Sequence, residues 1–204
     1  MEEFWNKRYD SESYIYGKEP NVFFRCKLDE ITPGRILLPA EGEGRNGIYA
    51  ARCNWEVDAF DLSVSGQMKA MNLADEYGVQ INYKTGSMDN IPFAGNTYDV
   101  VALLFAHWPE SLRAAYHQKL ISFLKPGGFL ILEGFSKLNL QYTEKYPQIG
   151  GPRDIGMLFS VDEIKSDFAD LEILILEAKE VELSEGENHK GTGHVVNFVG
   201  RYNG

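Results

Sequence analysis

From residue 35 onward, short apolar runs alternate with segments of helical period, and this alternation restricts the fold more than any other feature of the sequence. Strands are expected over 35–40, 56–63, 79–86, 98–105 and 129–135. Helices are expected in the intervals, because the apolar residues there recur every three or four positions. A regular alternation of strands and helices indicates a parallel sheet with helices on both faces.

Local signals mark the ends of several helices. Ser63 is expected to cap the second helix of this alternation, and Gly78 follows its end. Pro109 fits the first turn of a later helix. The stretch "LKPGG" is expected to end that helix and to make a sharp turn into the strand 129–135. Near the end of the chain, Ser160 and Glu163 have the spacing of a capping box.

The end of the chain changes character. Two strand-like runs, 171–183 and 194–202, are separated by the turn-rich "SEGENHKGTG". This pattern predicts an antiparallel hairpin with its turn in that segment. The segment 136–159 has no clear period, and a connection of that length is typical either of a lid or binding loop or of a surface excursion.

We therefore expect a single domain over 1–204, of α/β class, with a Rossmann-like doubly wound sheet. Within it, we assign 1–33 to an N-terminal helical and aromatic cap and 34–135 to a cofactor-binding core. The segment 136–160 is the expected lid, and 161–204 holds a helix and the C-terminal β-hairpin.

Composition narrows the partners. The net charge is -10 and lysines and arginines do not cluster, which argues against nucleic acid as a partner. No apolar run approaches the roughly 20 residues of a membrane span, and the N-terminus has no apolar signal core. Cys26 and Cys53 lack metal-ligand spacing, so no metal is predicted. We expect a cytoplasmic protein, and the sequence does not predict its oligomeric state.

The stretch "ILLPAEGEGRNGIYAA" carries glycines at 42, 44 and 47 between a strand and a helix. Such a turn lets a ligand approach the backbone, although it can also be only a tight connection. Asp61 follows Gly42 by nineteen residues at the end of the next strand, where an acid can accept from ribose hydroxyls. The two features together predict an adenosine-type ligand.

Two carboxylates in the turn discriminate between such ligands. A pyrophosphate beside Glu41 and Glu43 would be opposed by roughly 1 to 4 kcal/mol per carboxylate. S-adenosylmethionine instead carries a sulfonium and an ammonium, which the same carboxylates attract. Glu41, at the strand tip, is the stronger candidate, since Glu43 can equally be a solvated turn residue.

Four stretches, "LLPAEGEGRNGIYAA", "VDAFDLS", "YDVVALLFAHWP" and "LKPGGFLILEGF", resemble motifs of the class I S-adenosylmethionine-dependent methyltransferases. "FWNKRYDSESYIYGKEPN" and the C-terminal "GGPRDIGMLFSVDEI" and "ELSEGENHKGTGHVV" are similar to the group of tellurite-resistance (TehB-like) and thiopurine methyltransferases. The resemblance implies a sheet of about seven strands, mostly parallel with an antiparallel last strand, and S-adenosylmethionine as the cofactor.

The resemblance and the glycine turn together assign the cofactor site. Leu38 stands where the family usually has an acid, so we expect Glu41 to take over that role. Adenine is expected to meet Ser87, Asp89 or the backbone of Met88, and the sequence leaves these open. The predicted cofactor-binding residues are Ala40, Glu41, Gly42, Glu43, Gly44, Asn46, Asp61, Leu62, Ser87, Met88, Asp89 and Phe105.

The acceptor site is predicted from topology. Ligands of open parallel sheets bind outside the carboxyl ends of the strands, and the loops there contain His107, Arg153 and His189. Tyr16 is expected to close over the site, while His107 and Tyr16 can also be packed core residues. His189 can orient a nucleophile or accept its proton, and Arg153 can hold an anion. No catalytic residue is assigned.

The predicted function is methyl transfer to a small-molecule acceptor such as a thiol or a chalcogen oxyanion. Methyl transfer from a sulfonium depends mainly on alignment and exclusion of water, so no acid and base pair is required. Two alternatives remain open: an NAD-dependent oxidoreductase, and a methyltransferase-like module that binds a nucleoside without turnover.

Overall fold

The computed structural model describes residues 1–90 and 93–204. Its seven strands form one sheet in the order β3-β2-β1-β4-β5-β7-β6. The strands are β1 (Arg35–Pro39), β2 (Glu56–Asp61), β3 (Asn82–Thr85), β4 (Tyr98–Leu104), β5 (Leu124–Phe135), β6 (Glu172–Glu185) and β7 (His189–Arg201). β1 to β5 run parallel, and β7 is antiparallel to both β5 and β6. The predicted seven-stranded, doubly wound α/β sheet is confirmed.

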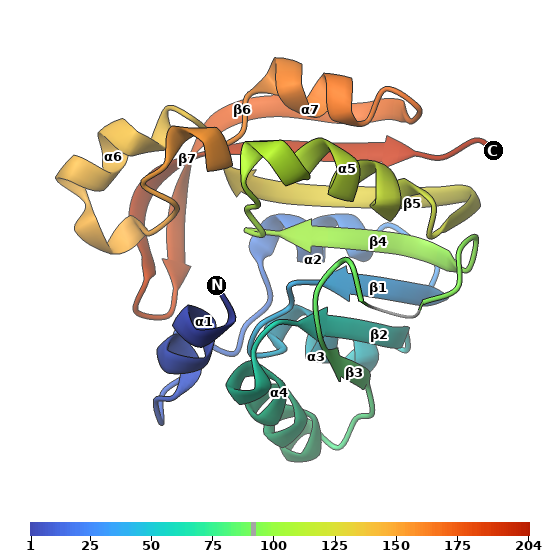
Figure 1. The fold of residues 1–204 in the computed structure, drawn as a ribbon. Helices are drawn as coiled ribbons and strands as arrows, with labels where there is room; N and C mark the ends of the chain where they lie inside the picture. The colour runs from blue at the N-terminus through green and yellow to red at the C-terminus, as the bar shows by residue number, and fades with distance from the viewer. Residues whose placement is uncertain (91–92) are drawn as a thin grey trace.

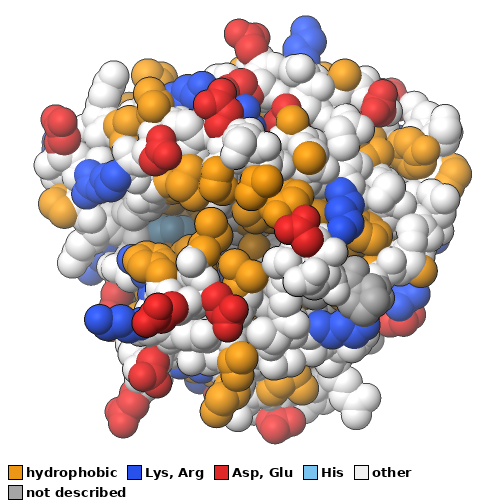
Figure 2. Space-filling model, in the orientation of Figure 1, with side chains coloured by type: hydrophobic (Ala, Val, Ile, Leu, Met, Phe, Trp, Pro, Cys, Tyr) orange, Lys and Arg blue, Asp and Glu red, His pale blue; other side chains and the backbone are white. Residues whose placement is uncertain are grey.

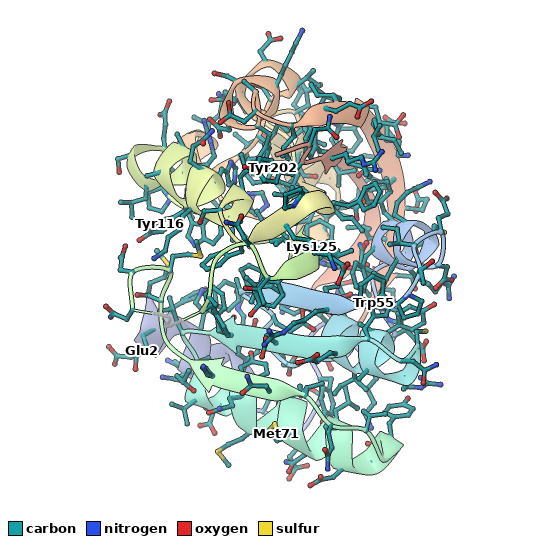
Figure 3. The ribbon with its side chains drawn as sticks, turned by 90° about the vertical axis from the view of Figure 1, so that its right-hand side faces the viewer. Glu2, Trp55, Met71, Tyr116, Lys125 and Tyr202 are labelled. Atoms are coloured by element: carbon teal, nitrogen blue, oxygen red, sulfur yellow. The ribbon has the colours of Figure 1, made fainter. Side chains whose placement is uncertain are left out.

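Helices cover both faces of this sheet (Figures 1 and 3). The helices are α1 (Glu2–Tyr9), α2 (Val22–Leu28), α3 (Arg45–Arg52), α4 (Val64–Tyr77), α5 (Glu110–Ile121), α6 (Asn139–Lys145) and α7 (Val161–Asp167), with 3-10 turns η1 (Pro147–Ile149) and η2 (Ile155–Met157). α5 and α7 cover one face, and α2 and α3 the other. In Figure 3, Tyr116 of α5 and Trp55, next to β2, lie on opposite sides of the sheet.

The central strands are apolar on both faces, as a sheet covered on both sides requires. In β1, Leu37 packs into the core under α5 and α7, whereas Ile36 and Leu38 pack into the core under α2, α3 and α4. β4 alternates in the same way, with Leu103 on the first side and Ala102 on the second. This explains why these strands read as continuous apolar runs rather than alternating ones.

The predicted caps are confirmed. The Ser63 hydroxyl accepts from the Gly66 N–H at 3.0 Å and begins α4, and Gly78 ends it in the left-handed conformation with φ 64°. Ser160 and Glu163 form the capping box of α7. These ends depend on residues three or four positions apart, and local sequence therefore specifies them.

The C-terminal hairpin is longer than predicted. β6 extends to Glu185 and β7 begins at His189, so most of "SEGENHKGTG" lies in strands. A Cβ on Gly193 would lie 2.8 Å from Ile149 Cγ1, and one on Gly191 would lie 3.3 Å from Tyr146. These glycines allow η1 to pack closely against β7 and do not form the turn.

The stretch "LKPGG" also differs from the prediction of a sharp turn. Tyr98 already pairs with Leu124, and after an irregularity Val100 pairs with Phe129. β5 therefore begins before Pro126, and residues between the two pairings form a bulge in which Gly127 has φ 87°. At one edge of the sheet, β3 is shorter than the predicted strand 79–86.

The segment 136–160 contains α6, η1 and η2, which the sequence did not predict. A bridge between Ser136 and Phe159 joins its two ends, and Ile149 and Leu158 are buried beneath it. Its role as a lid, like the division into cap and core, stays a prediction. Across 1–90 and 93–204, no helix has the length and apolar character needed to cross a membrane.

Asn21 joins α2 to the sheet, and its removal should destabilise the fold. Its side chain accepts from Phe24 N at 2.8 Å and donates to Glu133 at 2.6 Å and Glu185 at 3.1 Å. Asn21→Ala removes a helix cap, at about 1 kcal/mol, and leaves buried acceptors without a donor, at about 1–3 kcal/mol. We expect the free energy of unfolding in urea to fall by roughly 2–4 kcal/mol. Ser160→Ala, which removes a cap alone, should cost about 1 kcal/mol; equal losses would contradict the linking role.

Candidate active site

A cavity of about 660 Å³ opens at the carboxyl ends of β1, β2, β4 and β5. It lies where the chain order reverses between β1 and β4, the usual ligand position in such sheets. The N-terminal helix α1 and the end of the β6–β7 hairpin close it from the other side, at the left in Figure 1. In Figure 2, hydrophobic side chains gather around a hollow on this face.

The structure brings most of the predicted residues to this cavity. Its lining includes Ala40, Glu41, Glu43, Asn46, Asp61, Leu62, Ser87, Met88 and Phe105 of the predicted cofactor site. It also includes all four predicted acceptor-site residues, Tyr16, His107, Arg153 and His189. Gly42, Gly44 and Asp89 are not among the lining residues. Whether the lining residues contact a ligand stays a prediction.

The glycines of the turn are required by packing. A Cβ on Gly44 would lie 2.6 Å from the Cβ of Ala70, and one on Gly42 would lie 2.6 Å from the hydroxyl of Tyr9. Both glycines also have positive φ, 62° and 89° for Gly42 and Gly44. The turn can therefore approach α4 and α1 only without side chains at these positions.

Glu41 caps the helix that follows the turn. Its Oε1 accepts from the backbone N–H groups of Asn46 at 2.8 Å and Gly47 at 2.7 Å, in the first turn of α3. Burial raises the pKa of this carboxyl to about 7. A cation in the cavity would favour its ionised form, which is the property expected of a residue near the cationic end of S-adenosylmethionine.

Glu43 is neither solvated nor uncompensated. Its Oε1 lies 2.8 Å from Lys69 Nζ of α4, and its Oε2 accepts from the Tyr16 N–H at 3.4 Å. Lys69 is twenty-six residues from Glu43 in the sequence, so no local pattern predicts this pair. The carboxylates near the turn whose charge is not balanced in this way are Glu41 and Asp61.

Asp61 ties the glycine turn to the beginning of α4. One oxygen accepts from the Gly42 N–H at 3.1 Å and the other from the Ser63 N–H at 2.9 Å. Each carboxylate oxygen can accept a further hydrogen bond. Burial raises its pKa to about 6. The acid is thus positioned at the rim of the cavity, at the end of β2, as a ribose-binding acid would be.

The predicted adenine region is divided. Ser87 and Met88 line the cavity, but the Asp89 carboxylate accepts from the Tyr116 hydroxyl at 2.8 Å. The Met88 carbonyl accepts from Lys119. Of the three residues left open for adenine, Asp89 is directed toward α5.

His107 is packed, with both ring nitrogens used inside the protein. Nδ1 lies 2.8 Å from the Met157 carbonyl and Nε2 accepts from the Phe135 N–H at 3.1 Å, which assigns the ring proton to Nδ1. Burial lowers its pKa to about 4, so the ring is neutral. It contributes a ring surface to the cavity wall and links β4, β5 and η2.

His189 is held differently. Its Nδ1 lies 3.0 Å from Glu185 Oε2, and its ring lies against Phe105 and Tyr16 with centroid distances of 4.4 and 4.5 Å. Glu185 Oε2 also accepts from Arg45 at 2.8 Å. Against the opposing effect of burial, the charge of Arg45 and the hydrogen bond from His189 lower the pKa of Glu185 to about 2. Glu185 is therefore ionised.

Arg153 and the N-terminal segment complete the wall. Arg153 donates to the Thr143 hydroxyl at 2.7 Å and reaches the cavity from the segment 136–160. Tyr16 accepts a hydrogen bond from Arg8 at 3.0 Å, whereas the nearby Tyr14 donates to the Lys69 carbonyl and is not among the lining residues. Within the described residues, no cluster of histidine, cysteine and acidic side chains could hold a metal ion.

Sequence reasoning missed two groups of residues. The first is the wall formed by α1, which includes Phe4, Trp5 and Arg8. The aromatic composition of "FWNKRY" was a signal, but nothing local shows where a short terminal helix will pack. The second is Arg45, whose partner Glu185 is 140 residues distant.

The residues at the cavity fit S-adenosylmethionine better than a dinucleotide. Glu41 and Asp61 line it at the glycine turn, and Arg45, the lining cation beside that turn, is already paired with Glu185. A volume of about 660 Å³ is within the usual range for small-molecule sites. Glu41, Asn46, Asp61, Leu62 and Met88 would hold the cofactor.

Comparisons with known proteins agree with this fit. A family described as a methyltransferase domain matches residues 36–128. The chain is 31% identical over 119 residues to the ubiquinone/menaquinone biosynthesis C-methyltransferase UbiE of Geotalea daltonii, across 55% of this chain and 51% of the relative. The chain thus spans about half the length of this curated relative.

Solved structures share the fold. A structure that concerns the conversion of a disulfide bond into a thioacetal group during echinomycin biosynthesis has a TM-score of 0.77 at 16% identity, covering 100% of this chain and 92% of that one. TehB from Haemophilus influenzae has a TM-score of 0.71 at 16% identity, covering 98% and 66%. The likeness shows a common fold, that of the class I methyltransferases.

Asp61→Ala should weaken cofactor binding. A charge-assisted hydrogen bond to a ribose hydroxyl is worth roughly 1.5–3 kcal/mol, so we expect S-adenosylhomocysteine affinity to fall about 10- to 100-fold in calorimetric titration. Asp99→Ala is a matched control, because Asp99 accepts from the Arg35 N–H and pairs with Lys125 at the amino-terminal ends of the parallel strands, the side that faces the viewer in Figure 3 and lies opposite the cavity. It should lower stability and leave affinity unchanged. Unchanged affinity in Asp61→Ala, with a lower melting temperature, would assign Asp61 a structural role only.

Glu41 should make cofactor binding depend on pH. Because its pKa is about 7, the carboxylate becomes protonated as pH falls from 8 to 6, and its attraction for the sulfonium is lost. We expect S-adenosylmethionine affinity to fall by about tenfold over this range. S-adenosylhomocysteine, which lacks the sulfonium, should respond less. In Glu41→Gln, the affinities for the two ligands should depend on pH to the same extent. In Glu43→Gln the difference in pH dependence should remain, because the charge of Glu43 is balanced by Lys69.

Proposed function

We propose that the chain, a class I S-adenosylmethionine-dependent methyltransferase by its fold and its matched domain, transfers a methyl group to a small organic acceptor. The observation that carries this proposal is one continuous cavity. It joins Glu41 and Asp61 at the glycine turn to an aromatic region around Phe105, Trp108 and Phe135. S-adenosylmethionine supplies a methyl group on a cationic sulfur; the protein binds and aligns the two substrates and excludes water.

The cofactor end of the cavity is proposed at the tips of β1 and β2. Asp61 would accept from the ribose, and Leu62 and Met88 would contact the adenine. Glu41 would lie toward the methionine portion, which carries the positive charges. Ser87 stays a candidate for the adenine edge, because it lines the cavity.

The acceptor end is proposed to take an apolar body. Trp5, Phe105, Trp108, Phe135 and Met157 line it. Met1, Phe4 and Leu112 line the cavity and are also exposed to solvent, so apolar surface continues to the mouth. Burial of an organic acceptor against these side chains contributes about 25 cal/mol per Å² of apolar surface.

A thiol is favoured over a chalcogen oxyanion, although the group that includes TehB carries tellurite resistance in its name. An oxyanion would leave water for a wall of aromatic side chains and would approach the carboxylates of Glu41 and Asp61. Arg8 and Arg153 are the lining arginines not paired with a carboxylate in the described residues, and both already donate to hydroxyl groups. They suit one anionic substituent on an organic acceptor.

The alternatives predict different binding. An NAD-dependent enzyme would place a pyrophosphate beside Glu41 and Asp61, and a binding module would retain cofactor affinity without turnover. We expect micromolar affinity for S-adenosylmethionine and at least about tenfold weaker binding of NAD in calorimetric titration.

Turnover is tested by a screen of thiols, thiopurines, phenols, halides and tellurium oxyanions, with mass spectrometric detection of S-adenosylhomocysteine. We expect organic thiols to be methylated before oxyanions. Tighter binding of NAD would refute the cofactor assignment, and turnover confined to oxyanions would refute the organic acceptor.

A further inference from the structure

His189 and Glu185 form a carboxylate–imidazole pair at the turn of the β6–β7 hairpin, where β6 ends and β7 begins. Glu185 Oε2 lies 3.0 Å from Nδ1 of His189 and 2.8 Å from Arg45, and Glu185 Oε1 accepts from Asn21 at 3.1 Å. Both side chains are nearly fully buried. Because the carboxylate accepts from Nδ1, the ring proton is fixed there and the lone pair is on Nε2.

Nε2 is the ring nitrogen of His189 that Glu185 does not bind. No hydrogen-bond partner for this nitrogen occurs in 1–90 and 93–204. Position 150 is a glycine, and a Cβ there would lie 3.6 Å from Nε2. The ring itself is held by Tyr16, Phe105 and Phe135, which contact it on several sides.

The other three histidines cannot supply this function. Both nitrogens of His107 are hydrogen-bonded, as described above. His117 is fully buried against Asp167, and His194 is bonded to Ser136; neither lines the cavity. Among the described residues, His189 is thus the histidine that lines the cavity and has a ring nitrogen without a protein partner.

We propose that His189, oriented by Glu185, accepts the proton of the methyl acceptor. The inference rests on the proposed methyl transfer and deepens it, because it assigns the acceptor class: a nucleophile that carries a proton, such as a phenol or a weakly acidic thiol. The acceptor's lone pair forms a bond to the methyl carbon, and the bond from that carbon to sulfur breaks with its electron pair on sulfur. The acceptor's proton passes to Nε2, leaving imidazolium beside the Glu185 carboxylate.

The environment of His189 fits a base that works near neutral pH. Burial lowers its pKa, and Glu185 opposes that effect, while Arg45 and Arg8 act with burial. Tyr16 faces the ring from the N-terminal segment, and neutral His107 lies across the cavity wall. The ring is therefore free of its second proton at pH 7, and the rate should fall as pH is lowered through its pKa.

The first test measures the tautomer directly and needs no acceptor. In protein labelled with 15N-histidine, two-bond correlation spectra at pH 7 should show His189 protonated at Nδ1 and bare at Nε2. Its signals are identified by their loss in His189→Gln. In Glu185→Gln the preference for Nδ1 should weaken. A proton on Nε2 in the wild-type protein overturns the proposal.

The second test uses para-substituted thiophenols and phenols of graded acidity as probes, at pH 7. His189→Gln should lower kcat by about 100-fold for acceptors that are protonated at this pH, such as phenols with a pKa of roughly 10. For a thiophenol that is already ionised the loss should be several-fold at most. Equal losses for both kinds of acceptor would reduce His189 to a positioning residue, and no loss would remove it.

Controls separate this inference from the function on which it rests. His194→Gln, on the same strand but outside the cavity, should retain wild-type rates for every probe. Calorimetric titration of S-adenosylhomocysteine should give the same affinity in His189→Gln and wild type. If the cofactor does not bind the wild-type protein, the proposed function fails; if it binds and phenols are methylated at the same rate by His189→Gln and the wild-type protein, the base alone is refuted.

Discussion

The buried ion pair between Arg45 and Glu185 is the interaction on which the cavity depends. Arg45 begins the helix after the glycine turn, and Glu185 ends the strand β6, so their contact at 2.8 Å joins the cofactor side of the sheet to the C-terminal hairpin. Burying two charges costs free energy unless their other hydrogen-bonding positions are filled. Asn21 and His189 fill those of Glu185, and the Glu19 carbonyl accepts from Arg45. The Glu185 carboxylate thereby holds Asn21, Arg45 and His189 in fixed positions relative to one another.

The glycine turn combines structural and electrostatic roles. Gly42 and Gly44 allow α1 and α4 to pack against the turn, and Glu41 caps α3. The same burial that makes Glu41 a good cap raises its pKa, since the carboxylate is removed from water. A cationic ligand relieves that cost. The shape of the glycine turn alone would accept several adenosine-containing ligands. The Glu41 carboxylate favours a positively charged one, such as S-adenosylmethionine.

The sequence predicted what depends on neighbouring residues. The strands of the parallel sheet, the Ser63 cap and the Ser160 capping box depend on patterns within a few positions, and the structure confirms them. The hairpin turn was misplaced because Gly191 and Gly193 resemble turn residues but serve close packing against η1. The Lys69 partner of Glu43 could not be predicted, since a contact across twenty-six residues leaves no local pattern.

The turn of the β6–β7 hairpin contacts the N-terminal segment, and this contact affects the order in which the parts of the protein can assemble during synthesis. The Glu187 N–H donates to the Ile15 carbonyl at 2.9 Å, and Gly186 approaches Ile15 so closely that a Cβ would lie 2.3 Å from that carbonyl oxygen. The first segment of the chain is thus held in place by one of the last. On a ribosome, β1 to β5 can assemble while the N-terminal segment still lacks this partner. The hairpin supplies part of the cavity lining, including His189. The cavity is therefore complete only after β6 and β7 have been synthesised, and a nascent chain that ends at β5 does not contain the finished site.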